Sequence, residues 1–292
     1  MSSRIIMKNF KALFVIPKEV PHQVATAQAL IEGFKRHGIL DAKIVKNFNP
    51  ATMRADLIAM WAWRPKRTGA HWYHIHKAQQ ASGGHSLVME RAYLGERHTW
   101  TSLGYDGLNG RGDFCNANIR NPGRFNKHFS DLLKPWQTKK TNRVLVAGQC
   151  KFDAAVSHIN IEDWYRNVTL ELSLRGYDVI FREHPLNVAN RWNFSGLPVT
   201  LDTSASFEES MQSVDCVVTY NSNGGVLSTL AGIPTISHDI GSMVHNVTKH
   251  DLKDLNYQPD RKDWAAKISY AQWLPSEMES GEAWAHLKQK YK

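Results

Sequence analysis

Short apolar runs alternate with amphipathic stretches through the first half of the chain. Residues 11–17, 55–63 and 85–91 are apolar runs with the length of buried strands. Between the first two, apolar side chains recur at helical spacing over residues 24–34, and Gly38 follows as a suitable helix C-cap. Strands that alternate with helices at this rhythm predict a parallel α/β sheet.

The same alternation returns in the second half. Asn160 is a suitable N-cap for a helix that ends near Gly176, and shorter helices are expected at 207–211 and 224–232. The apolar runs expected to form strands are residues 143–149, 177–181, 215–220 and 233–237. The second half therefore repeats the architecture of the first.

The periodicity is lost between the two series. Residues 97–135 show no regular pattern, and glycine, aspartate and asparagine crowd the stretch 104–114, so we expect long loops there. The chain is predicted to form two Rossmann-like α/β domains, residues 1–135 and 136–262. The amphipathic tail, residues 263–292, is predicted to form helices that pack back toward the first domain.

Composition narrows the class of protein. The chain has 292 residues, of which 42% are apolar and 22% charged, and no apolar run approaches the roughly 20 residues of a membrane span. Cys115, Cys150 and Cys216 are widely spaced and indicate free thiols. The first residues lack the pattern of a secretory signal, so a cytoplasmic location is expected. The net charge of +9 favours polyanionic ligands and nucleotide phosphates.

Two strand ends in the second half carry candidate binding residues. "FREHPL" ends an apolar run on ionisable residues before Pro185 stops the strand, and "NSNGG" joins a strand to a helix. Such a turn brings backbone N–H groups close to a phosphate, and ligands of open α/β sheets bind at the carboxyl ends of strands. A plain tight turn and a purely structural His184 are the alternatives. The predicted donor-binding residues are Arg182, His184, Asn221, Ser222, Asn223, Gly224 and Gly225.

The strand-ending "HP", the later Ser/Asn-Gly turn and the "AGIPTIS" after it resemble the C-terminal half of GT-B glycosyltransferases. The chain is most similar to their capsule-type branch (Kdo- and sialyltransferase-like), and it also resembles phage enzymes that glycosylate hydroxymethylated pyrimidines in DNA. The resemblance covers residues 143–285 and implies two domains facing a central cleft. It implies that His184 and the turn hold the donor phosphates and that Glu208 or Glu209 reaches the ribose. No cofactor beyond the nucleotide-sugar is implied. A UDP-sugar is expected, because the acidic-acidic-Gly motif of sialyltransferases is not plainly present.

An inverting transferase needs a carboxylate that deprotonates the acceptor hydroxyl. The resemblance places this base in the N-terminal domain, where the candidates are Glu90, at the end of a strand, and Asp106 and Asp113, in the glycine-rich loop. An Asx-type turn at Asp106 and an ion pair between Asp113 and Arg111 are the alternatives. Cationic and N–H groups can stabilise the leaving phosphate. The histidines of "HWYHIH" lack metal-ligand spacing, so we expect no metal site and a metal-independent reaction.

The acceptor is inferred from basic and aromatic residues in the first half. Lysine and arginine can contact DNA phosphates, and tryptophan can stack on an extruded base. The preferred acceptor is therefore a 5-hydroxymethylpyrimidine in DNA. If a phage encodes the chain, the expected location is the host cytoplasm. The first alternative is a bacterial surface polysaccharide, because the same groove suits an acidic glycan. The second is a non-catalytic nucleic-acid-binding α/β protein, and a sugar-nucleotide 2-epimerase ranks last. The sequence leaves the oligomeric state open.

Overall fold

The structure, a computed structural model, divides into two compact units. It describes residues 9–63, 66–151, 153–187 and 192–292, with side chains in the first helical turn at 66–70 left out. The first unit comprises Met1–Leu108, Gly112–Arg120 and Lys267–Lys292, and the second comprises Asn109–Arg111 and Asn121–Ala266.

The division differs from the expected boundary at residue 135. The stretch 121–135 joins the second unit, where the backbone N–H of Lys134 donates to the carbonyl of Leu230 at 2.8 Å. At the other end the second unit extends to Ala266 rather than to residue 262. The final segment, Lys267–Lys292, belongs to the first unit.

The first unit is a six-stranded sheet with the order β11-β5-β4-β3-β1-β2. Strands β1 to β4 are parallel, whereas β5 is antiparallel to β4 and β11 is antiparallel to β5. Its elements are β1 (Lys11–Val15), α1 (Pro21–Arg36), β2 (Asp41–Val45), β3 (Leu57–Trp61), α2 (Lys66–Ala81), β4 (His85–Arg91), β5 (Thr101–Tyr105), η6 (Ser269–Ala271), β11 (Gln272–Trp273), α8 (Pro275–Glu279), α9 (Glu282–Leu287) and η7 (Lys288–Tyr291).

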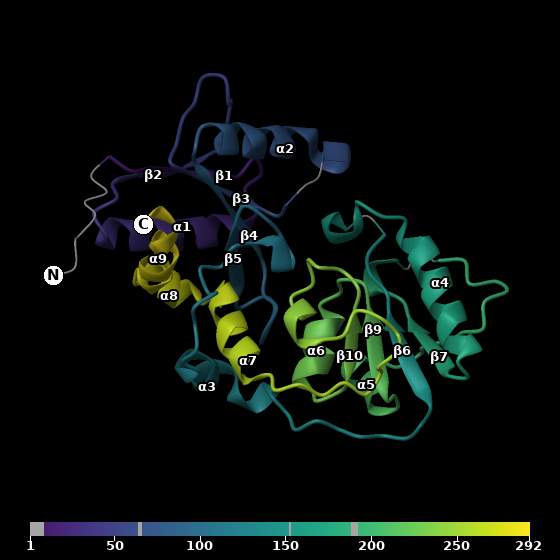
Figure 1. The fold of residues 1–292 in the computed structure, drawn as a ribbon. Helices are drawn as coiled ribbons and strands as arrows, with labels where there is room; N and C mark the ends of the chain where they lie inside the picture. The colour runs from purple at the N-terminus through teal and green to yellow at the C-terminus, as the bar shows by residue number, and fades with distance from the viewer. Residues whose placement is uncertain (1–8, 64–65, 152, 188–191) are drawn as a thin grey trace. The chain divides into compact units, whose positions relative to one another are not determined.

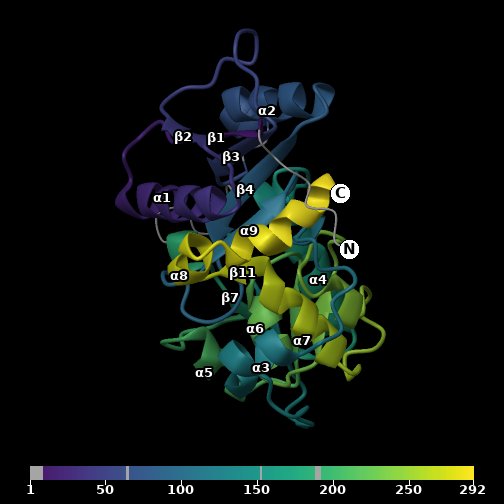
Figure 2. The same cartoon turned by 90° about the vertical axis from the view of Figure 1, so that its left-hand side faces the viewer.

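Alternate residues of the parallel strands face two hydrophobic cores. Phe14 of β1 joins Phe34 of α1 and Trp284 of α9 on one face, and Leu13 joins Ile75 of α2 on the other. Figures 1 and 2 show α1, α8 and α9 together on one face of this sheet and α2 on the opposite face. Both faces are therefore covered, which explains why these strands are apolar almost throughout.

The strand β5 lies inside the stretch that the sequence predicted as loop. All five of its residues are buried between β4 and β11, although Thr101 and Ser102 are polar. The hydroxyl of Thr101 lies 3.5 Å from that of Thr26. A short strand with polar residues at its start has no apolar run to mark it, and for this reason the prediction of a loop was wrong here.

The second unit is a five-stranded parallel sheet with the order β10-β9-β6-β7-β8. Numbered within the unit, this order is 5-4-1-2-3, which is the Rossmann arrangement. Its elements are η1 (Asn109–Arg111), α3 (Gly123–Phe129), η2 (Ser130–Leu132), β6 (Arg143–Ala147), η3 (Ala154–Val156), α4 (Ile161–Leu174), β7 (Asp178–Arg182), η4 (Pro185–Asn187), β8 (Thr200–Leu201), α5 (Phe207–Gln212), β9 (Cys216–Thr219), α6 (Gly224–Leu230), β10 (Thr235–Ser237), η5 (His245–Val247) and most of α7 (Lys262–Ile268).

Helices cover both faces of the second sheet as well. Tyr165 of α4 packs on one face, and Met211 of α5 packs on the other. Asn160 caps α4, as predicted, by accepting the backbone N–H of Glu162 at 3.2 Å. Two helix-covered parallel sheets confirm the predicted class of two Rossmann-like α/β domains.

Each sheet has one place where the strand order reverses. In the first unit it lies between β1 and β3, and in the second it lies between β6 and β9. Open α/β sheets bind their ligands outside the carboxyl ends of the strands at such switch points. The fold therefore directs attention to the residues that follow these four strands.

Candidate functional site

Gln149 and Asn221 follow the two strands that flank the switch point of the second unit. Gln149 Oε1 accepts the backbone N–H of Asn221 at 2.8 Å, and its own backbone N–H donates to the Tyr165 hydroxyl at 2.7 Å. Asn187, after β7, donates from Nδ2 to the Gln149 carbonyl at 2.9 Å. All three polar side chains are buried. These bonds hold the ends of β6, β7 and β9 together, and we call Gln149, Asn187, Asn221 and Asp239 the polar rim.

Asp239, after β10, is the charged member of the rim. It accepts from Asn221 Nδ2 at 2.5 Å and from both terminal nitrogens of Arg111 at 2.7 and 2.6 Å. Its side chain is 3% exposed, whereas that of Arg111 is 41% exposed. Burial by itself raises the pKa of Asp239, but the hydrogen bonds and charge of Arg111 outweigh it, and the pKa lies below its usual value. Asp239 is therefore ionised at neutral pH and fixes Asn221 in place.

His184, predicted to bind the donor, lies where β7 gives way to the η4 turn. Its Nδ1 accepts the backbone N–H of Leu186 at 3.2 Å, and its carbonyl accepts that of Asn187 at 2.9 Å. Because Nδ1 is an acceptor, the neutral ring carries its proton on Nε2. The Nε2–H group can donate a hydrogen bond to a phosphate oxygen. The contact between His184 and the donor phosphates stays a prediction.

Arg182 does not lie as the sequence predicted. Its Nη1 pairs with Asp202 at 2.6 Å and also donates to the Ser210 hydroxyl at 2.8 Å and the Ser204 carbonyl at 3.1 Å. Its side chain is 15% exposed and that of Asp202 is 7% exposed. The prediction that Pro185 turns Arg182 toward a ligand is corrected, since the buried carboxylate of Asp202 holds the guanidinium within the unit.

The "NSNGG" turn uses several of its N–H groups internally. The N–H of Ser222 donates to Thr219 Oγ1 at 2.9 Å, and those of Gly224 and Gly225 donate to Ser222 Oγ at 3.2 Å and to its carbonyl at 3.0 Å. A Cβ on Gly224 would lie 2.8 Å from the ring of Phe207, so close packing explains this glycine. The N–H groups of Ser222, Gly224 and Gly225 are therefore engaged within the turn, and the ligand contacts of the turn residues stay predictions.

Glu208 follows the residue that packs on this turn. It is exposed in the first turn of α5, next to the Phe207 whose ring contacts Gly224. Its neighbour Glu209 accepts the backbone N–H of Ala205 at 2.8 Å and so has a local capping role. The ribose contact stays a prediction for Glu208.

Aromatic residues that sequence reasoning missed surround the rim. Tyr220 follows β9 and donates to or accepts from His158 Nε2 at 3.0 Å. Trp164 donates from Nε1 to His238 Nδ1 at 2.7 Å, and its ring lies 5.6 Å from that of Tyr220. Like Gln149 and Asp239, Tyr220 and His238 come within two residues of a strand end, and this position in the sequence was the available signal.

Among the three predicted bases, Glu90 lies at the carboxyl end of the first sheet. It is the penultimate residue of β4 and is half-buried. Its Oε1 accepts the backbone N–H of Arg91 at 3.1 Å. This edge is where open α/β sheets carry their chemistry, so the placement of Glu90 is compatible with the predicted role.

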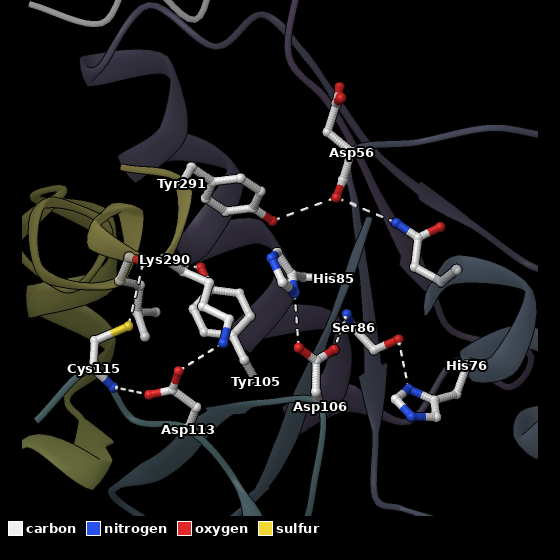
Figure 3. Close-up of polar contacts among 12 residues, drawn as sticks. Asp56, His76, His85, Ser86, Tyr105, Asp106, Asp113, Cys115, Lys290 and Tyr291 are labelled. Atoms are coloured by element: carbon white, nitrogen blue, oxygen red, sulfur yellow. Dashed lines mark hydrogen bonds and ion pairs between the residues drawn. The ribbon is translucent and has the colours of Figure 1, made fainter. Parts of the chain in front are cut away.

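Asp106 and Asp113 lie at the other end of the same sheet (Figure 3). Because β5 is antiparallel, its end lies beside the start of β4, where Asp106 pairs with His85 Nδ1 at 2.7 Å. Asp113 pairs with Lys290 Nζ at 2.7 Å and accepts the backbone N–H of Cys115 at 2.8 Å. This placement makes Asp106 and Asp113 weaker candidates than Glu90, and the identity of the base stays a prediction. The alternative partner considered for Asp113 was wrong, since Arg111 pairs with Asp239.

Two further kinds of site were sought in the part of the chain that the structure describes. There, no three His, Cys, Asp or Glu side chains are placed to hold a metal ion. Within the same residues, no helix has both the length and the apolar character needed to cross a membrane.

Comparison with known proteins finds similarity in structure only. No protein-family model matches the chain, and no curated protein matches it in sequence. Among solved structures, the β-Kdo 2,4-transferase of KpsC from Thermosulfurimonas dismutans matches with a TM-score of 0.58 and 14% identity over 90% of each chain. The β-Kdo 2,7-transferase of KpsC from the same organism matches with a TM-score of 0.56 and 12% identity, over 97% of this chain and 100% of that chain. This chain has their fold. The predicted resemblance to capsule-type GT-B transferases is thus confirmed at the level of fold.

Proposed function

We propose that this chain is a glycosyltransferase that moves a sugar from a nucleotide-sugar donor to a hydroxyl of a bacterial surface polysaccharide. The observation that carries the proposal is the fold shared, over 90% of both chains, with a β-Kdo 2,4-transferase. The buried polar rim supports it independently, because the switch point of a Rossmann-like sheet is where nucleotides bind.

The donor is proposed to bind at the polar rim of the second unit. His184 would donate from Nε2 to a phosphate oxygen, and this hydrogen bond would strengthen as the leaving group gains charge. Asn221, fixed by Asp239, would orient the nucleotide. We propose a UDP-sugar as donor and a reaction that needs no metal, and both points enter the test below.

The base is proposed to be Glu90. An inverting reaction needs a carboxylate that takes the acceptor proton as the new glycosidic bond forms and the nucleotide departs. Of the predicted carboxylates, Glu90 alone lies at the carboxyl edge of its sheet, since Asp106 and Asp113 are committed to His85 and Lys290 at the other end.

The polysaccharide replaces DNA as the leading acceptor. Positive charge was the main ground for DNA, and charge serves an acidic glycan equally well. Both structural neighbours reported above are named as Kdo transferases, and neither name refers to a nucleic acid. The hydroxymethylpyrimidine acceptor remains an outcome that the test can return.

The test combines donor binding with product mass. Purified protein is titrated with UDP and CMP by calorimetry, then incubated, with and without EDTA, with UDP-hexoses or CMP-Kdo and either Kdo-terminated oligosaccharides or hydroxymethylated DNA. A sugar mass increment on an oligosaccharide supports the proposal. An increment on DNA alone would instead support the hydroxymethylpyrimidine acceptor. If the protein bound no nucleotide and transferred sugar to no acceptor, the proposal of a glycosyltransferase would be refuted.

One substitution localises the donor. His184→Ala should weaken binding of the accepted nucleotide on the order of tenfold, the worth of one charge-assisted hydrogen bond. His74→Ala, an exposed histidine of α2 in the first unit, is the matched control and should leave it unchanged. If the two substitutions changed nucleotide affinity equally, His184 would be excluded as a donor-binding residue.

A further inference from the structure

A cluster of His22, Trp61 and Arg91 occupies the switch point of the first unit. His22 lies in the first turn of α1, which follows β1, and Trp61 is the last residue of β3. Their ring centroids are 4.7 Å apart in an edge-on contact. Arg91, the last residue of β4, places its guanidinium carbon 5.6 Å from the Trp61 ring centroid. All three side chains are only partly buried, so a ligand can reach them.

The Arg91 guanidinium is held in place without being neutralised. Its Nη2 donates to His22 Nε2 at 3.4 Å, and among the described residues no carboxylate lies within ion-pair distance of it. Glu90 turns an oxygen toward the backbone N–H of Arg91. Glu96 accepts the backbone N–H groups of His98 and Thr99. By contrast, Arg111 in the second unit has both terminal nitrogens on a carboxylate.

His22 adds no charge of its own at neutral pH. Burial, the charge of Arg91 and that of His98 all lower its pKa from the usual value. Because a guanidinium can only donate, His22 Nε2 must accept, and the ring proton lies on Nδ1. The cluster therefore presents one fixed guanidinium, backed by an indole ring and a neutral imidazole, at the edge where this sheet is expected to bind its ligand.

We propose that this cluster is an acceptor subsite that binds the carboxylate of an acidic sugar, with Arg91 as the residue that pairs with it. A guanidinium matches a carboxylate through two parallel N–H···O bonds, and Trp61 and His22 hold its plane in place. Glu90, the proposed base, precedes Arg91 in β4, so both residues lie at the carboxyl edge of the same sheet. The inference rests on the proposed function and gives its acceptor a chemical class.

The test measures acceptor binding without donor and without turnover. The full chain is titrated, by ligand-observed NMR or calorimetry, with the methyl glycoside of Kdo, with its neutral carboxamide and with glucose 6-phosphate. The carboxylate should bind roughly tenfold or more tightly than the carboxamide, the usual worth of an ion-paired hydrogen bond. Equal binding of the two, or tightest binding of the phosphate, would overturn the assignment.

Variants connect the preference to Arg91. Arg91→Gln should abolish the preference for the carboxylate, and Arg91→Lys, which keeps the charge but loses the fork, should reduce it. Lys43→Gln is the matched control because it removes one positive charge from the same unit. Lys43 is exposed on β2, where its Nζ lies 3.8 Å from Oδ1 of the exposed Asp41. It should keep the full preference. A preference that survives Arg91→Gln, or that is lost equally in Lys43→Gln, would overturn the proposal.

The pH dependence offers a second readout. A carboxylate beside His22 favours the charged ring and so raises its pKa, which means that binding takes up protons and tightens as pH falls from about 8 to about 6. The groups that His22 faces are Arg91, His98 and the Trp61 ring, and no described carboxylate pairs with it. His22→Asn should flatten this dependence. Nucleotide binding, measured in the same preparations, tests the second unit separately. If the protein bound no nucleotide, the proposed function would be refuted, while the acceptor measurements could still be interpreted.

Discussion

Arg111 is the partner that keeps Asp239 charged inside the second unit, and Arg111→Ala should expose the cost of that charge. Removing one member of a fully buried ion pair costs about 3–5 kcal/mol, whereas exposed pairs are worth about 0–1 kcal/mol. Asp239 is 3% exposed but Arg111 is 41% exposed. An intermediate loss of about 2 kcal/mol is therefore expected near pH 7.

The pH dependence of this loss separates electrostatics from packing. In the native protein the folded pKa of Asp239 lies below its unfolded value, so the contribution of the pair is complete above roughly pH 4 and fades as pH falls through the folded pKa. Arg111 supplies the largest causes that lower this pKa, so without it burial is expected to raise the folded pKa of Asp239 above the unfolded value. The penalty is then complete at neutral pH and shrinks as pH falls through the raised pKa.

Hydrogen exchange of the β9 and β10 amides measures the local free energy of opening in this unit, at about pH 7 and about pH 4.5. The Arg111→Ala penalty should be clearly smaller at the lower pH and smaller in an Asp239→Asn background. Arg143→Ala is the control, since its 3.1 Å pair with Asp178 is about half exposed on both sides and should cost less than about 1 kcal/mol. A penalty that is independent of pH and unchanged by Asp239→Asn would refute the electrostatic reasoning.

Four further outcomes test the site and its packing. Glu90→Gln should lower turnover about 100-fold or more with donor affinity unchanged, whereas Asp106→Asn should keep near-native turnover. If steady-state kinetics gave the opposite ranking, Asp106 would be the better candidate for the base. Arg182→Ala should cost about 3 kcal/mol of stability because it strands a buried carboxylate, and a selective loss of donor affinity in a stable variant would give Arg182 a ligand role. Gly224→Ala should cost about 1–3 kcal/mol in thermal melts, and an added Phe207→Leu should relieve part of it, since the new Cβ would meet that ring at 2.8 Å. EDTA should leave turnover unchanged, and its loss with rescue by a divalent cation would contradict metal independence.

The sequence was informative where a strand is buried on both faces. The apolar run at 215–220 became β9 (Cys216–Thr219), and the cap at Asn160 starts α4 as expected. Such strands are nearly continuous apolar runs, and a cap is a local pattern, so both can be recognised from adjacent residues. The strand β5 (Thr101–Tyr105) lacks that signal because its burial depends on strands distant in the chain.

The site residues were predictable in type and position but not in orientation. Arg182 was chosen for its place after a strand, yet its partner Asp202 lies 20 residues further on, and only the fold brings them together. Asp239 was missed because its partner Arg111 is 128 residues away. Asp106 was misplaced because the direction of β5, which decides at which edge of the sheet it lies, is not encoded in the residues around it.

The discontinuity of the first unit has a consequence for how the protein is made. Trp273, Met278 and Trp284 are fully buried in its core, yet they are among the last residues of the printed sequence to leave the ribosome. The second unit is almost contiguous, since all but three of its residues fall within Asn121–Ala266. Domains fold as their residues emerge during synthesis. The second unit is thus expected to complete its core first, while the nascent first unit lacks part of the cover on one sheet face until residue 284 has emerged.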